Sequence, residues 1–84
     1  MNSNPNLSAA ILVVVENQLN GNNPPETKQT YNRLLEAGFS ENEAKRLIGH
    51  VVSAEIFDIM KKKEPFNLER FVKALNKLPK MPGE

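Results

Sequence analysis

Glu55 is the residue whose type and position most strongly suggest chemistry. At about 100° per residue, five apolar side chains lie within about 60° of it on one helix face: Ala44, Ile48, Val51, Val52 and Ile59. Burial raises the pKa of a carboxylate unless a cation or a hydrogen-bond donor meets it. Glu55 is therefore either a perturbed acid or metal ligand, or a satisfied polar group. We favour the satisfied group, with the Tyr31 hydroxyl, Arg33 or a backbone amide as its partner.

Catalysis would require further functional groups beside Glu55. The chain has one histidine, His50, and no cysteine. His50 lies about 140° from Glu55 around the same helix, so the two side chains cannot act together. Transition-metal sites take several histidine, cysteine or carboxylate ligands, so we predict no metal, no other cofactor and no enzymatic activity. A metal- or acid-dependent enzyme that uses Glu55, Glu16 and His50 is the alternative.

Basic residues are concentrated near the C-terminus. Residues 61–80 carry seven basic and two acidic side chains, although the net charge of the whole chain is only +1. Such residues could contact phosphates, but a charged run of this kind is also typical of a solvated helix face. We favour the solvated face and keep nucleic-acid binding as an alternative. The possible basic patch consists of Lys61, Lys62, Lys63, Arg70, Lys73 and Lys77.

The segment over residues 7–19 is apolar around nearly the whole circumference of a helix. A helix that is apolar all round must be buried all round, yet one helix of a small bundle has only two or three neighbours. We therefore predict that part of it binds a partner, either a second copy of this chain or another helical protein, with a monomer as the alternative. The face expected to form this interface carries Leu12, Val15 and Leu19.

Helix-breaking residues divide the chain into four segments with helical periodicity. The run Ile11–Val15 also has strand propensity, but no second stretch that alternates with a period of two could pair with it. The predicted fold class is all-α: a compact bundle of four helices with a long, central third helix. The predicted helices span residues 5–20, 25–37, 41–62 and 68–78.

Local signals mark where two of these helices begin. The segment Ser40–Glu43 has the residues of a capping box, in which the hydroxyl and the carboxylate each satisfy a backbone amide. Asn67 is the expected cap of the fourth helix. Phe66 and Phe71 occupy the two positions of a hydrophobic staple around that cap.

Three glycines carry information about helix ends and packing. Gly21 and Gly38 are expected to adopt the left-handed conformation that ends the first and second helices. Gly49 lies inside the third helix, where glycine costs about 1 kcal/mol relative to alanine. Its presence there indicates that another helix approaches closely.

Length and composition indicate one domain. The chain has 84 residues, 39% of them hydrophobic, which is enough for one modest core. We expect residues 1–84 to form a single helical domain, ordered over about residues 4–79, with a loose tail at 80–84. No apolar run is long enough for a membrane span. The apolar run Leu7–Val15 has no Lys or Arg before it, unlike a signal peptide, so we predict a cytoplasmic protein that does not bind membranes.

One short stretch resembles a known family. Residues 34–40, with the sequence Leu-Leu-Glu-Ala-Gly-Phe-Ser, are followed by Glu43 and Ala44. They resemble the Gly-Phe loop of ubiquitin-associated domains, a loop that contacts ubiquitin. The similarity is local, because the third predicted helix lacks the break that this fold needs.

A wider resemblance covers residues 4–78. It is carried by Asn4-Pro5, Glu16–Leu19, Pro24–Thr27, Arg33–Leu35, Gly38–Ser40, Glu43-Ala44, Glu55–Phe57, Pro65–Asn67, Arg70-Phe71 and Ala74-Leu75. In this order they are similar to a bacterial family of small uncharacterised helical domains, a domain-of-unknown-function family. Members of that family carry histidines four residues apart on the first helix, which suggests a metal site. Ser8 and Leu12 occupy those positions here, so no ligand carries over, and the resemblance implies a bacterial cytoplasmic helical protein without an assigned activity.

These observations favour a non-enzymatic helical module for protein interaction or scaffolding. Its main support is the unusually apolar first helix. The enzyme and the nucleic-acid-binding protein remain the two alternatives.

Overall fold

Four helices form the computed structural model, which describes residues 5–80 and the side chains of residues 9–80. Their bounds are α1 (Pro5–Gly21), α2 (Pro25–Glu36), α3 (Glu41–Lys62) and α4 (Leu68–Lys77). The all-α fold class is confirmed, and the third helix is the longest of the four. Predictions about Asn4, about the side chains of Leu7 and Ser8, and about residues 81–84 lie outside the described residues.

Both predicted helix starts are confirmed. The Ser40 hydroxyl accepts a hydrogen bond from the Glu43 amide at 3.1 Å, and the Ser40 amide donates to the Glu43 carboxylate at 2.9 Å. At the start of α4, the Asn67 side chain accepts from the Arg70 amide at 3.0 Å. The rings of Phe66 and Phe71 lie 5.5 Å apart across this cap. Side chains close in sequence thus satisfy the amides that a helix start leaves unpaired.

The two predicted helix stops have different outcomes. Gly38 has the left-handed conformation, with φ of 103°, and ends α2 as predicted. The prediction for Gly21 is wrong, because α1 continues through Gly21 and the left-handed residue is Asn22, with φ of 51°. The Asn23 amide then donates to the Gln18 carbonyl at 3.1 Å, which closes the last turn. Asparagine tolerates this conformation better than most residues, so the turn does not need the glycine.

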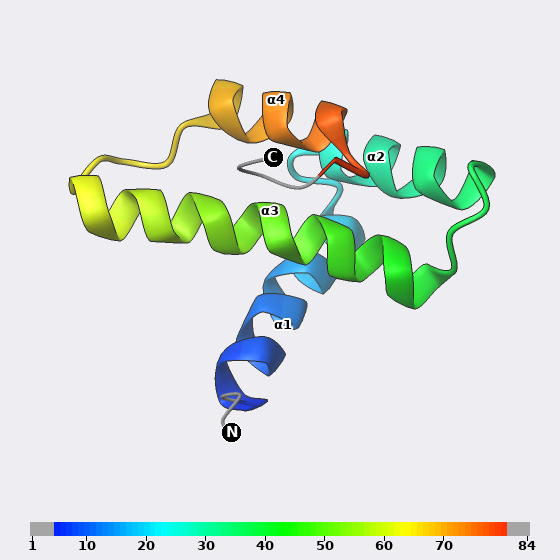
Figure 1. The fold of residues 1–84 in the computed structure, drawn as a ribbon, viewed down its shortest axis with the longest axis horizontal. Helices are drawn as coiled ribbons and strands as arrows, with labels where there is room; N and C mark the ends of the chain where they lie inside the picture. The colour runs from blue at the N-terminus through cyan, green and yellow to red at the C-terminus, as the bar shows by residue number, and fades with distance from the viewer. Residues whose placement is uncertain (1–4, 81–84) are drawn as a thin grey trace.

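The helices pack around α3, as Figure 1 shows. The chain turns back after α3, so that α4 runs antiparallel along it, while α1 crosses α3 steeply and its N-terminal half extends beyond it. Within residues 5–80, α2 and α3 each contact all three other helices, whereas α1 and α4 do not contact each other. The largest side chains of the shared core are Leu34, Ile48, Phe71, Leu75 and Leu78.

The close approach predicted at Gly49 is confirmed. A Cβ atom built on Gly49 would lie 3.3 Å from Cγ2 of Ile11 and 4.0 Å from Cγ2 of Val15, both on α1. The missing side chain therefore lets α1 lie against α3. This contact determines which face of α1 points into the core.

None of the helices within residues 5–80 combines the length and the apolar character needed to cross a membrane.

Candidate functional site

Glu55 is buried and bound to α4. Its side chain is 6% exposed. Both carboxylate oxygens accept from the Arg70 guanidinium, Oε1 from Nε at 2.9 Å and Oε2 from Nη2 at 2.7 Å. Oε2 also accepts from the backbone amide of Asn67 at 3.0 Å. The expectation of a satisfied carboxylate with a backbone amide as a partner is confirmed, and the main partner is Arg70.

These contacts determine the protonation state of Glu55. The hydrogen bonds from Arg70 hold its pKa below the ordinary value for glutamate, and the Asn67 amide acts in the same direction, although burial alone would raise the pKa. Glu55 in turn raises the pKa of Arg70. Glu55 is therefore ionised at neutral pH and its oxygens are occupied as acceptors. In this state it cannot act as a general acid; it ties the start of α4 to α3.

The predicted polar site of Glu55 with Tyr31 and Arg33 is wrong. The Arg33 guanidinium instead donates to the carbonyls of Leu75 and Leu78, each at 3.0 Å. It thereby binds carbonyls at the C-terminus of α4, where a cation is favourable; the Leu75 carbonyl also accepts from the Leu78 amide at 3.1 Å. Tyr31 is partly buried and packs against the apolar core.

Glu16, Glu55 and His50, the residues proposed for a metal- or acid-dependent enzyme, make separate contacts. Glu16 accepts a hydrogen bond from Lys45 at 2.8 Å, which links α1 to α3 and raises the pKa of Lys45. Glu55 is held by Arg70, and His50 is exposed on the outer side of α3. Among residues 9–80, no three His, Cys, Asp or Glu side chains come close enough together to bind a metal ion.

The basic patch loses its only arginine. Arg70 forms ion pairs with Glu55 at 2.7 Å, with Glu64 at 3.3 Å and, more weakly, with Asp58 at 3.9 Å. Its charge is therefore used within the chain. The lysines of the patch are exposed, and the Lys61 ammonium lies 5.6 Å from the centre of the Phe57 ring.

The predicted interface on α1 requires correction. Val15 is fully buried and Leu19 is 8% exposed, so both belong to the core of this chain. The physical reason is Gly49, which lets Val15 approach α3 and turns this side of α1 inward. Leu12, at 46% exposed, is the only member of the predicted face that remains accessible, and Val13 beside it is 55% exposed.

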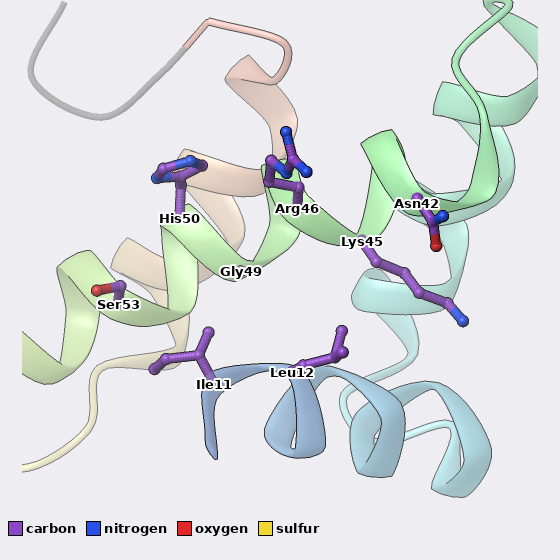
Figure 2. Close-up of a pocket in the computed structure, with 8 residues that line it drawn as sticks. All are labelled: Ile11, Leu12, Asn42, Lys45, Arg46, Gly49, His50 and Ser53. Atoms are coloured by element: carbon purple, nitrogen blue, oxygen red, sulfur yellow. The ribbon is translucent and has the colours of Figure 1, made fainter. Parts of the chain in front are cut away.

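An open groove of about 600 Å³ lies between α1 and α3. Figure 2 shows Ile11 and Leu12 projecting from α1 toward α3, while Arg46 and His50 project from α3 on the side away from α1. We call this feature the α1–α3 groove. Its lining is Ile11 and Leu12 from α1, and Asn42, Lys45, Arg46, Gly49, His50 and Ser53 from α3.

An exposed apolar stripe begins one turn beyond the groove on the same face of α3. Ile56, Phe57 and Met60 are 37%, 62% and 72% exposed, and together with Ser53 they have the spacing i, i+3, i+4, i+7 of a single helix face. We call these three residues the outer stripe. Sequence reasoning missed it, although this spacing is a signal that could have revealed it.

Comparison with known proteins finds no relative of this chain. No protein-family model matches it, nor does any curated protein or solved structure. The structure therefore defines the class of protein as a small all-α domain with a groove of mixed polarity and an apolar stripe on one face. The two family resemblances and the cytoplasmic location stay predictions.

Proposed function

We propose that this protein is a non-enzymatic interaction module that binds a helical segment of a partner protein. The observation that carries the proposal is the outer stripe on α3. Phe57 and Met60 lie about 160° and 140° from the buried Glu55 around the helix. They point away from the core, so α3 has a second apolar face that no element within residues 5–80 covers.

The energetics favour a partner on this face. Burying apolar surface contributes roughly 25 cal/mol per Å², and Phe57 and Met60 are more than half exposed. Apolar surface that is contiguous, rather than scattered singly, marks an interaction site. Methionine adapts its shape to a partner and is common on binding surfaces. Substituting polar residues at these positions would remove little from the core of this chain.

The groove continues the same surface toward α1. Ser53 lines the groove and shares a helix face with the outer stripe, so a partner helix could contact both. Leu12 on α1 supplies an apolar wall of the groove. A helix laid into an apolar groove is a recurrent mode of recognition, with anchors at helical spacing.

Site-specific cross-linking followed by titration tests this function. A photoreactive amino acid is placed at position 57 or, as a control, at the exposed position of Gln29 on α2, and cells are irradiated. We expect an adduct from position 57 only. The captured protein is then purified and titrated calorimetrically against wild type, Phe57→Ser and Leu68→Ser.

The titration compares the affinities of wild type, Phe57→Ser and Leu68→Ser for the captured protein. Leu68 is 48% exposed on α4, so Leu68→Ser removes a comparable apolar side chain from outside the proposed surface. We expect Phe57→Ser to weaken binding at least about tenfold, which corresponds to about 1.4 kcal/mol, while Leu68→Ser binds as wild type does. Circular dichroism checks that each variant is folded. Equal affinity of wild type and Phe57→Ser would contradict the proposal.

A further inference from the structure

We infer that the bound segment is an acidic amphipathic helix, which lies along α3 in the α1–α3 groove and on the outer stripe. This inference rests on the proposed function and adds the chemistry of the partner. It follows from the shape of the surface, from its length and from the charges at its two ends.

The surface has the length of a short helix. From Arg46 to Met60 it covers fifteen residues of α3, and the fourteen steps between them span about 21 Å at a rise of about 1.5 Å per residue. An occupant of about four turns would therefore cover it. The groove is concave between α1 and α3, with Ile11 and Leu12 as one wall. This shape suits a cylinder better than a flat surface.

Positive charges flank the apolar centre of this surface. Arg46 lies beside the groove at one end, and the exposed Lys61, Lys62 and Lys63 follow the outer stripe at the other. None of these four forms an ion pair within the described residues. Carboxylates flanking the apolar residues of a partner helix would meet these cations. Such complementarity speeds association and selects the partner.

Some of the nearby acidic groups are already paired with other cations. Glu16 is paired with Lys45 at 2.8 Å. The Glu43 carboxylate accepts a hydrogen bond from the Ser40 amide in the capping box. Glu64 is paired with Arg70 at 3.3 Å. Glu16 and Glu64 are thus neutralised by these pairs, whereas Glu41 and Glu43 in the first turn of α3 keep their charge. The positive charge presented to an occupant is therefore concentrated at Lys61, Lys62 and Lys63.

The same charges disfavour a second copy of this chain as the occupant. In a twofold dimer the same surface patch is used by both chains. A parallel pairing would place Lys61, Lys62 and Lys63 of the two copies together, and an antiparallel pairing would place them opposite Arg46 of the other copy. Juxtaposed like charges suppress a pairing. An acidic helix from another protein meets the same apolar residues without this repulsion.

Two designed peptides test the charge preference. Both have about 16 residues and the same apolar residues at i, i+3, i+4 and i+7, but one is flanked by glutamates and the other by lysines. Fluorescence anisotropy measures their binding to the full chain. We expect the glutamate peptide to bind at least about tenfold more tightly, with an affinity that falls between about 50 and about 300 mM salt as screening increases.

Matched charge reversals locate the contact. The double variant Arg46→Glu/Lys61→Glu should bind the glutamate peptide at least about tenfold more weakly than wild type. The double variant Lys73→Glu/Lys77→Glu makes the same change in net charge on α4 and should bind as wild type does. Phe57→Ser should weaken binding of either peptide. Circular dichroism verifies that the variants remain folded.

The alternative outcomes separate the two proposals. If both peptides bind equally well and Phe57→Ser abolishes binding, the acidic partner is wrong and the interaction surface stands. If Phe57→Ser and Arg46→Glu/Lys61→Glu bind the glutamate peptide as wild type does, the surface itself is wrong.

Absence of peptide binding together with sedimentation of the protein on vesicles of phosphatidylglycerol and phosphatidylcholine overturns the inference in favour of a membrane surface. Concentration-dependent dimerisation that Phe57→Ser abolishes overturns it in favour of a second copy.

Discussion

At the scale of single residues, Glu55 shows how a carboxylate is accommodated within an apolar stripe. Arg70 contacts it with two nitrogens, at 2.9 and 2.7 Å, and the Asn67 amide supplies a third donor. Paired, planar contacts of this kind are the strong form of the arginine–carboxylate interaction. Removing one partner of a buried ion pair lowers the free energy of unfolding far more than replacing both partners with apolar residues, because it leaves a buried charge without compensation.

Variants of the pair should therefore differ in stability. We expect Arg70→Met to lower the free energy of unfolding by about 3 kcal/mol, since it leaves the buried Glu55 carboxylate without its cation. Glu55→Gln should cost about 1–2 kcal/mol because the amide still accepts hydrogen bonds. Glu55→Leu/Arg70→Met should recover much of the loss seen in Arg70→Met. Urea unfolding followed by circular dichroism measures these values, and a neutral Arg70→Met would contradict this reading of the pair.

The pair also predicts an acid dependence of stability. The pKa of Glu55 is lower in the folded state than its usual value, so the unfolded state binds this proton more readily. The stabilisation is fully present above the unfolded pKa of about 4.3 and is lost as the pH falls through the lower folded pKa. Between about pH 6 and about pH 3, wild type should thus lose more stability than Glu55→Gln.

Glu36→Gln is the control for this pH series. Glu36 is exposed on α2 and forms no ion pair within the described residues, so Glu36→Gln should keep the acid dependence of wild type. Equal acid dependence in wild type and Glu55→Gln would mean that the pair does not hold Glu55 in its ionised form.

At the scale of helices, α3 has two faces with different roles. Its inner face carries buried residues such as Ile48, Val51 and Glu55, and Gly49 accommodates the close approach of α1. Its outer face carries the outer stripe, which no helix within the described residues covers. The capping box begins this helix at Glu41, and contacts with α1, α2 and α4 hold it in place.

Removing the cap should destabilise the chain. Ser40→Ala deletes the hydroxyl that accepts from the Glu43 amide, and we expect the free energy of unfolding to fall by about 1 kcal/mol. Ser53→Ala is the matched control, because Ser53 is exposed in the middle of the same helix, where alanine is at least as favourable as serine. Thermal and urea unfolding compare the two variants; equal stability of both would show that the capping box contributes nothing.

At the scale of the whole molecule, charge and apolar surface are arranged on one side. The α1–α3 groove, with Ile11 and Leu12 as its apolar wall, and the outer stripe form a continuous track along α3. Arg46 lies near one end of this track and Lys61, Lys62 and Lys63 lie at the other. Val15 and Leu19 are buried in the core of this chain, whereas Leu12, Phe57 and Met60 remain exposed. The surface is therefore available to a partner without any rearrangement of the bundle.

This arrangement predicts that the isolated chain is a monomer. Twofold pairing through the track would oppose like charges, and the buried Val15 and Leu19 cannot contribute to an interface. Sedimentation equilibrium at high micromolar concentration should therefore give a mass near 9.4 kDa. Leu12→Glu, on the exposed side of α1, should leave this mass unchanged. A mass twice as large in wild type, reduced by Leu12→Glu, would contradict the prediction.

The sequence alone determined the helices, their caps and much of their ends. These features depend on residues within four or five positions of one another, such as Ser40 with Glu43, Phe66 with Phe71, and Gly38 with the turn before it. The period of the apolar residues likewise placed Glu55 on the buried face of α3. Local hydrogen bonding and helical geometry require no knowledge of which helices meet.

The tertiary structure decided which groups are partners and which faces remain exposed. Arg70 reaches Glu55 because α4 folds back antiparallel along α3, and Arg33 is drawn instead to the end of α4. Val15 is buried because α1 packs at Gly49. An apolar helix offers several equivalent faces, and only contact with its neighbours selects the buried one. The proposed binding surface is the apolar face that this selection leaves exposed.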